Sequence, residues 1–244
     1  KMQKREKFFQ NKRGLSHIEA ILSFVIFIGF LIFAFFFFSP FSGNRVLDST
    51  LDYGFREVAD EVSTDLESYS VIIKDEVSDS LVGIEIDTSV ENAKARVEDA
   101  QGNKIDSKLD GNVVYFDRSQ AQNNNFFIVE FSEDFTNDNI ESGALLEEDN
   151  NYTISSSDKR KVYSEKKFLE LNESYSTDYT VLKKDFNLPN RVDFGFSLVF
   201  DDGGRISTER NIPENVEVIS EQKRIEVIKE YGEIIFADFI VKVW

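Results

Sequence analysis

Residues 15–41 read LSHIEAILSFVIFIGFLIFAFFFFSPF, and this stretch decides how the rest of the chain is organised. From Ala20 to Phe38 only Ser23 and Gly29 interrupt 19 otherwise apolar residues. A helix over residues 15–39 would rise about 37 Å at ~1.5 Å per residue, which is enough to cross the hydrocarbon layer of a membrane. We therefore expect one membrane-spanning helix that ends near Pro40 and Gly43.

The charge of the chain changes sign across this helix. The 244 residues include 28 Lys and Arg and 45 Asp and Glu, for a net charge of −17. Residues 1–14 hold six of the basic residues and one acid, a charge of +5, which leaves −22 on the rest. Because positive segments stay on the cytoplasmic side of a membrane, the sequence predicts a cytoplasmic N-terminus and an acidic extracellular domain.

Two alternatives compete with a retained membrane helix. A buried core helix of a soluble protein seldom runs this long without polar residues. A conventional secretory signal has a shorter apolar region, of about 7–15 residues, followed by small residues at its cleavage site. Residues 35–40 read FFFFSP and lack that cleavage pattern, so the sequence favours a helix that stays on the protein.

The residues in front of the apolar stretch have the composition of a processing site. Residues 12–14 (KRG) are followed directly by residues 15–19 (LSHIE). This arrangement resembles the class III signal peptide of type IV pilins and related archaeal surface filaments, over residues 12–36. The resemblance implies that a prepilin peptidase cleaves between Gly14 and Leu15, and that Glu19 becomes the fifth mature residue, where pilins carry a glutamate. Leu15 in place of Phe and the high aromatic content depart from the bacterial pattern.

Glu19 also has a physical interpretation of its own. An unpaired carboxylate costs several kcal/mol inside lipid. Cleavage after Gly14 creates a positive amino group on Leu15, and in a filament this amine can pair with Glu19 of a neighbouring subunit and set the axial register. The alternative is that Glu19 lies among lipid headgroups, where a helix N-terminus favours it. Nine of the 24 phenylalanines lie in residues 24–41, and we expect helix packing through Phe24, Phe27, Phe30 and Phe33.

A second helix and a β-rich region are expected after the apolar stretch. Apolar residues recur at helical spacing from Leu47 to Leu66, which predicts an amphipathic stalk. After Ser68 short alternating runs are separated by Gly, Asp and Asn turns, which predicts strands. Hairpins are expected at residues 101–103 and 201–204, a short helix at 179–186, and a central strand at 234–244.

Two further features lie in the expected extracellular region. Residues 136–151 hold five acidic residues and four Asn, which predicts a loop or a boundary between two subunits of the domain. Asn151 and Asn172 each begin an Asn-x-Ser/Thr sequence and are glycosylation candidates on an exported face.

The sequence contains no motif for catalysis, a cofactor or a metal. It has no Cys, its single His is His17, and we find no phosphate-binding loop or nucleophile elbow. A pI near 4.5 disfavours nucleic acid as a partner. We therefore expect no enzyme activity, and an ectoenzyme ranks third among the functional hypotheses.

The sequence thus predicts an α+β protein in three parts. Residues 1–14 are a leader, 15–67 a hydrophobic helix and stalk, and 68–244 a β-rich, sandwich-like acidic domain outside the membrane. The resemblance implies a structural subunit of an archaeal type IV pilus-like surface filament. Its partners would be further copies of the chain, a prepilin peptidase, the pilus assembly machinery and, before assembly, the membrane. The alternative is a single-span, membrane-anchored surface binding protein that does not polymerise.

Overall fold

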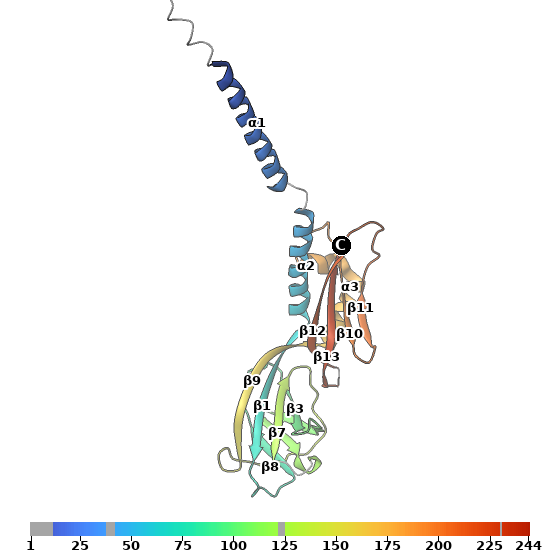
Figure 1. The fold of residues 1–244 in the computed structure, drawn as a ribbon. Helices are drawn as coiled ribbons and strands as arrows, with labels where there is room; N and C mark the ends of the chain where they lie inside the picture. The colour runs from blue at the N-terminus through green and yellow to red at the C-terminus, as the bar shows by residue number, and fades with distance from the viewer. Residues whose placement is uncertain (1–11, 38–41, 122–124, 230) are drawn as a thin grey trace, which may run out of the picture. The chain divides into compact units, whose positions relative to one another are not determined.

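The structure, a computed structural model, describes residues 12–37, 42–121, 125–229 and 231–244 (Figure 1). The chain divides into two compact units, Lys1–Val46 and Leu47–Trp244. The helices are α1 (Lys12–Phe37), α2 (Ser42–Glu61) and α3 (Glu165–Asp185), with a 3-10 turn, η1, at Arg118–Gln120. The strands are β1 (Ser63–Ile73), β2 (Leu81–Glu85), β3 (Lys94–Asp99), β4 (Lys104–Ile105), β5 (Ser107–Asp110), β6 (Val113–Asp117), β7 (Phe126–Ser132), β8 (Ala144–Leu145), β9 (Tyr152–Ser164), β10 (Phe194–Phe200), β11 (Arg205–Thr208), β12 (Ile219–Ile228) and β13 (Ile234–Val243). The predicted α+β class, with an apolar N-terminal helix and a β-rich domain, is confirmed.

Helix α2 packs on the sheet through its apolar stripe, but it is shorter than the sequence pattern predicted. Leu51, Phe55 and Val58 are buried in the same cluster as strand β13. The sequence predicts a helix up to Leu66, but α2 ends at Glu61 and Leu66 lies in strand β1. Leu66 is buried there because β1 pairs with β7 on one side and β9 on the other, so strand pairing overrides the helical spacing of its side chain.

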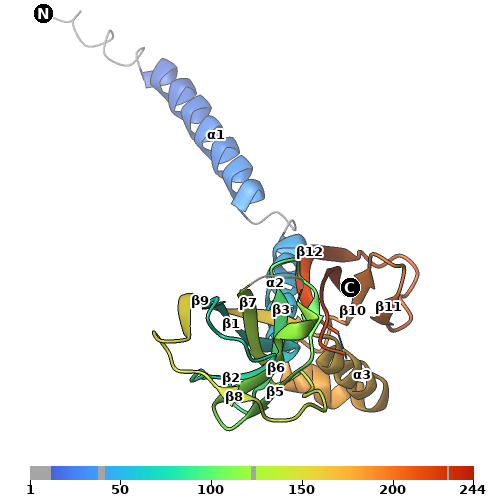
Figure 2. The ribbon, with the colours of Figure 1, turned by 90° about the horizontal axis from the view of Figure 1, so that it is seen from below.

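A nine-stranded sheet runs through the whole second unit. Its strand order is β11-β10-β13-β12-β9-β1-β7-β3-β4, and a second sheet has the order β5-β6-β2-β8. Strands β1 and β9 are the longest antiparallel pair, and β12 joins β9 through a short parallel pairing at Val227 and Ile228. These long strands divide the unit into a helical lobe, residues 47–66 and 159–244, and a double-sheet lobe, residues 67–158 (Figures 1 and 2).

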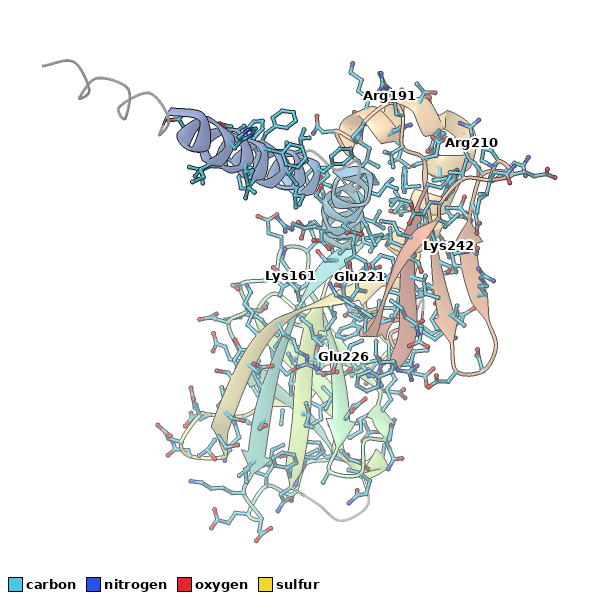
Figure 3. The ribbon with its side chains drawn as sticks, turned by 45° about the horizontal axis from the view of Figure 1, so that its top comes forward. Lys161, Arg191, Arg210, Glu221, Glu226 and Lys242 are labelled. Carbon is cyan, nitrogen blue, oxygen red and sulfur yellow. The ribbon has the colours of Figure 1, made fainter. Side chains whose placement is uncertain are left out.

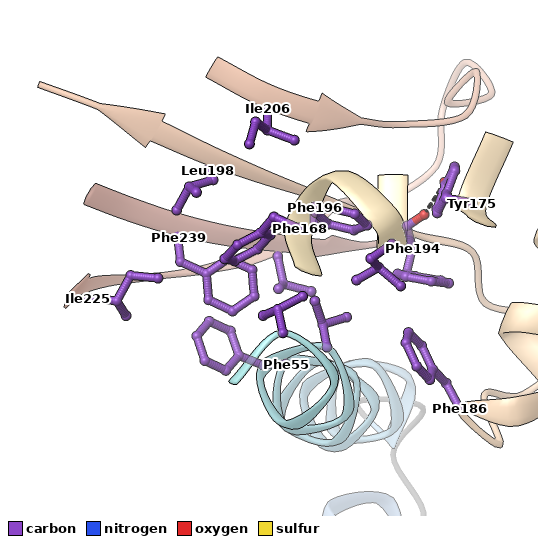
Figure 4. Packing of buried hydrophobic residues seen from close by; sticks show 14 of the residues in the cluster. Phe55, Phe168, Tyr175, Phe186, Phe194, Phe196, Leu198, Ile206, Ile225 and Phe239 are labelled. Carbon is purple, nitrogen blue, oxygen red and sulfur yellow. Dashed lines mark hydrogen bonds between the residues drawn. The ribbon is translucent and has the colours of Figure 1, made fainter. Parts of the chain in front are cut away.

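The helical lobe is built from α2 and α3 packed on strands β10 to β13. Phe55 meets Phe239 with ring centroids 4.7 Å apart, and Phe168 of α3 meets Phe239 at 5.3 Å (Figure 4). Helix α3 is longer than the predicted helix at 179–186, which corresponds only to its second half. The two halves meet at Asp178, whose backbone is not helical. The missed first half buries Phe168, Leu171 and Tyr175 at spacings of three and four residues.

The double-sheet lobe is a small sandwich. Strands β1, β7 and β3 of the large sheet contribute Val71, Phe127 and Val97, and the small sheet contributes Val82 and Phe116 to one buried cluster. The 136–151 stretch belongs to this lobe and is not a boundary between subunits, because β8 lies within it and pairs with β2. A boundary at one position in this stretch would not separate the two lobes, because strands β1 and β9 each run through both lobes.

A third, smaller cluster joins the two lobes. Leu66, Phe135, Val162 and Ile228 are buried together on the opposite face of the large sheet from the two main cores. Arg96 of β3 donates a hydrogen bond to the carbonyl oxygen of Gly232, in the turn between β12 and β13. The lobes are therefore linked by strands, by an apolar cluster and by a polar contact.

The turn predictions are confirmed. The 101–103 turn joins β3 to β4, and the 201–204 turn joins β10 to β11. Gly203 has a φ of +87°, a conformation that favours glycine. The predicted central strand near the C-terminus is β13, which lies between β10 and β12 and buries Ala237, Phe239 and Val241.

Candidate functional site: the apolar helix α1

Helix α1 presents apolar side chains on its whole circumference. Thirteen large apolar side chains between Ile18 and Phe35 are exposed within the described part of the chain. The 19 residues His17–Phe35 are long and apolar enough to cross a membrane, and none of this segment is buried. Transferring each large side chain out of water is worth about 1.5–3 kcal/mol, so the helix requires lipid or protein around it.

Glu19 is the single Asp, Glu, Lys or Arg residue of His17–Phe35 and is exposed. It follows the predicted cleavage site by one turn of helix, since α1 includes the backbone of Gly14 and Leu15. The side chain of Leu15 and the leader residues 1–11 lie outside what the structure describes. A helix that began at Leu15 would place Glu19 in its second turn, close to the positive end of the helix dipole.

The four phenylalanines expected to pack together do not form one stripe. Phe24, Phe27, Phe30 and Phe33 are between 55% and 63% exposed. A step of three residues turns the side chain by about 300°, so each successive ring is displaced by about 60° around the axis. The four rings therefore cover half of the helix circumference and can serve several neighbours, but not a single two-helix contact.

Gly29 interrupts the large apolar side chains near the middle of α1. A Cβ atom placed on Gly29 would meet no atom within 4 Å in the described part of the chain. Glycine in a helix interior costs about 1 kcal/mol relative to alanine, and no contact among the described residues requires it. Small residues on apolar helices leave room for close approach by another helix, and Gly29 is such a residue in the middle of α1.

Helix α2 is held on the folded domain by apolar packing and by one cation–π contact. Tyr53 and Ala59 pack beside the buried stripe of α2, and the ammonium of Lys223 lies 4.0 Å from the centroid of the Phe55 ring. The opposite face of α2 exposes Asp48, Asp52 and Asp60. Residues 38–41, which connect α1 to α2, lie outside the described residues.

The two sequons occupy different local structures. Asn151 precedes β9, and its Oδ1 accepts a hydrogen bond from the backbone N–H of Glu147 at 3.0 Å. Asn172 is in the first half of α3, where its carbonyl oxygen accepts from the Ser176 hydroxyl at 2.9 Å. Both asparagines are partly exposed.

A partly buried polar cluster in the helical lobe lies directly after the kink of α3 at Asp178. Tyr179 donates to Asp193 Oδ1 at 2.8 Å, and Lys183 Nζ donates to the same oxygen at 2.9 Å. Burial raises the pKa of Tyr179 well above its ordinary value and raises that of Tyr175 to about 12. Burial opposes ionisation of Asp193, but Lys183 and Tyr179 outweigh it and lower the pKa of that carboxyl. This cluster fastens the second half of α3 to the residue that precedes β10.

Comparison of the chain with protein-family models, curated proteins and solved structures gave no match. Among the described residues, no group of three or more His, Cys, Asp or Glu side chains is arranged to hold a metal ion. The features available for a functional argument are therefore α1, its single carboxylate and the domain attached to it.

Proposed function

We propose that this chain is a structural, pilin-like subunit of a cell-surface filament. In this proposal the leader is removed after Gly14 and α1 lies in the membrane before assembly. The α1 helices then bundle in the filament core, and the Leu47–Trp244 unit lies outside the cell. The observation that carries the proposal is an apolar helix exposed on all sides, with one carboxylate, Glu19, near its start.

The arrangement of the chain supports assembly over simple anchoring in two respects. A lipid anchor requires only apolar length, and neither Glu19 nor Gly29 contributes to that. In a helix bundle, by contrast, Glu19 has a partner in the new amino group of a neighbour, and Gly29 permits close packing. The alternative function, a permanently anchored surface binding protein, uses α1 only as a span.

Replacement of Glu19 by glutamine separates the two functions. The experiment measures, in cells that carry the assembly machinery, the amount of chain in the membrane fraction and in sheared surface filaments. We expect Glu19→Gln to leave the membrane amount unchanged and to lower the filament amount by about tenfold, the effect of losing ~1.4 kcal/mol of pairing.

Asp52→Asn is the matched control, because it removes an equally exposed carboxylate from α2. It should leave filaments at the wild-type level. A permanent anchor would give surface display without filaments in the wild type, and Glu19→Gln would then have no effect on display.

A further inference from the structure

The two lobes of the folded unit differ in their basic residues. The double-sheet lobe, residues 67–158, has 21 acidic and six basic residues, for a net charge of −15. The helical lobe, residues 47–66 and 159–244, has 22 acidic and 15 basic residues, for a net charge of −7. The two lobes have similar numbers of acidic residues, so they differ in how many basic residues offset the negative charge.

Carboxylates of the double-sheet lobe are hydrogen-bonded mainly by neutral side chains. Asn103 donates to Asp99 at 3.0 Å, Gln120 donates to Asp106 at 2.8 Å, and Asn150 donates to Glu147 at 2.8 Å. The same kind of contact recurs in Asn112 to Glu85, Asn125 to Asp75 and Ser119 to Asp117. These bonds satisfy the oxygens but leave every negative charge in place.

Ion pairs are correspondingly scarce in this lobe. Within the described residues, two ion pairs lie wholly inside it, Arg96–Glu98 and Lys104–Asp138. Three more of its carboxylates, Glu67, Asp158 and Glu133, meet cations of the helical lobe at the boundary between the lobes. In the helical lobe the carboxylates meet cations instead. These pairs are Lys183–Asp193, Arg224–Asp201, Arg224–Asp238, Lys242–Glu209, Arg160–Glu226, Lys223–Glu221, Lys229–Asp202, Lys159–Asp65 and Lys161–Asp60; Figure 3 labels Glu221, Glu226, Lys242 and Lys161 among them.

We infer that the double-sheet lobe is a salt-dependent module, whose packing requires dissolved cations that screen its uncompensated carboxylates, whereas the helical lobe does not require them. Repulsion among like charges opposes a compact state. The screening length is about 10 Å at 0.1 M salt and about 3 Å at 1 M, so concentrated salt removes repulsion between neighbouring side chains of this lobe. The inference does not depend on whether α1 assembles into a filament.

The cations act here as a diffuse atmosphere and not as bound ligands. No described group of carboxylates is arranged to hold a metal ion, and the acidic side chains that the argument uses are spread over strands and turns of the lobe. Monovalent salt should therefore be enough to stabilise the double-sheet lobe, and this stabilisation should increase over a wide range of salt concentration.

Hydrogen exchange of the full chain in non-ionic micelles tests the inference lobe by lobe. The measurement follows backbone amides of β2, β3 and β6 against those of β10 and β13, at fixed pH, between about 2 M and about 0.1 M NaCl. We expect exchange in the double-sheet lobe to accelerate by at least about tenfold at low salt, and exchange in the helical lobe to change by less than about threefold.

Two matched sets of six neutralising substitutions complete the test. All twelve side chains are exposed. The double-sheet set is Glu76→Gln, Asp79→Asn, Glu91→Gln, Asp110→Asn, Glu141→Gln and Glu148→Gln. The helical set is Asp52→Asn, Glu61→Gln, Glu170→Gln, Glu173→Gln, Glu214→Gln and Glu217→Gln.

The first set should abolish most of the salt dependence of β2, β3 and β6, and the second set should leave it unchanged. Equal acceleration in both lobes of the wild-type chain would overturn the inference, because general salting-out acts on both. Retention of the full salt effect in the double-sheet set would overturn it as well.

Discussion

Two buried carboxylates on adjacent strands have opposite electrostatic surroundings. Glu67 on β1 and Glu130 on β7 are 5% and 6% exposed and project from opposite faces of the large sheet. Burial alone would raise the pKa of Glu67, but Ser89 and Thr88, followed by Lys159, outweigh it and lower this pKa to about 2. Burial, followed by the Glu98 carboxylate, raises the pKa of Glu130. The same residue type therefore stabilises the fold at one position and opposes it at the other.

We predict that Glu67→Gln lowers the free energy of unfolding by about 2 kcal/mol at pH 7. The folded pKa lies below the usual value of 4.5, so this stabilisation is complete above that pH and is lost as the pH falls towards 2. Urea unfolding in micelles at several pH values measures the effect. The variant should also show a flatter decline between pH 4.5 and 2, and an unchanged decline would contradict this account.

Glu130→Gln should have the opposite effect. One Glu130 oxygen is buried without a hydrogen-bond partner among the described residues, and ionisation of the carboxyl is opposed by its surroundings. Because the folded pKa is raised, the stabilisation that Glu130 contributes is present at low pH and is lost as the pH rises through that pKa. The glutamine variant should therefore be more stable than the wild type by about 1 kcal/mol at pH 7 in the same unfolding assay. If Glu130→Gln lowered the unfolding free energy as much as Glu67→Gln does, the fold would depend on the Glu130 charge and this account would be wrong.

At the scale of elements, the first half of α3 provides an aromatic anchor for the helical lobe. Phe168 is fully buried between Phe239 and Phe196, whereas the adjacent Leu169 is 45% exposed. We predict that Phe168→Ala costs about 4 kcal/mol of unfolding free energy because it leaves a cavity in the core. Leu169→Ala is the control and should cost less than about 0.5 kcal/mol. Equal costs in thermal or urea unfolding would refute the packing shown in Figure 4.

Helix α1 yields a prediction about Gly29. Gly29→Leu adds apolar volume and should insert into the membrane as well as the wild type does, since leucine is favourable in lipid. If another helix approaches at this position, the leucine side chain should reduce filament yield by at least about tenfold. Val25→Leu, which adds one methylene at an already large residue, is the control and should assemble normally. Wild-type filament yield in Gly29→Leu would exclude a close approach there.

Elements with strong local periodicity could be predicted from the sequence, and elements that depend on distant pairing could not. The alternation Ile235, Ala237, Phe239 identified β13, and the apolar length of residues 20–38 identified α1. The stripe Phe168, Leu171, Tyr175 was present but lay among charged residues, so the first half of α3 was missed. Leu66 fits the helical spacing of α2, and only its pairing with Arg160 on β9 places it in a strand.

At the scale of the whole molecule, the third cluster is the apolar contact that links the two lobes besides the shared strands and the Arg96–Gly232 hydrogen bond. Phe135 is 1% exposed and lies against Gly232, whose Cβ position would be 3.2 Å from its ring. We predict that Phe135→Ala lowers the unfolding free energy by about 3–4 kcal/mol and separates the unfolding of the lobes into two transitions. Hydrogen exchange resolved by lobe measures this separation. Tyr231→Ala, in the same turn but 83% exposed, should unfold like the wild type; a single transition in Phe135→Ala would contradict the coupling.

The candidate site could be located from the sequence because length, apolarity and charge asymmetry act without tertiary structure. Glu19 and residues 12–14 could be identified as candidate site residues from their positions along the chain alone. The division of charge between lobes could not be predicted in the same way, because the double-sheet lobe is bounded by β1 and β9 and its limits appear only once those strands are paired. The net charge of −17 conceals that division as well as the positive leader.

The central claim is that the chain is processed after Gly14 and assembled through α1. The most direct measurement is N-terminal sequencing of the chain recovered from purified surface filaments of cells that carry the assembly machinery. Our account predicts a sequence that begins Leu-Ser-His-Ile-Glu, at Leu15, in material taken from filaments. A chain that retains residues 1–14, or that is absent from filaments and present only in the membrane, would contradict it.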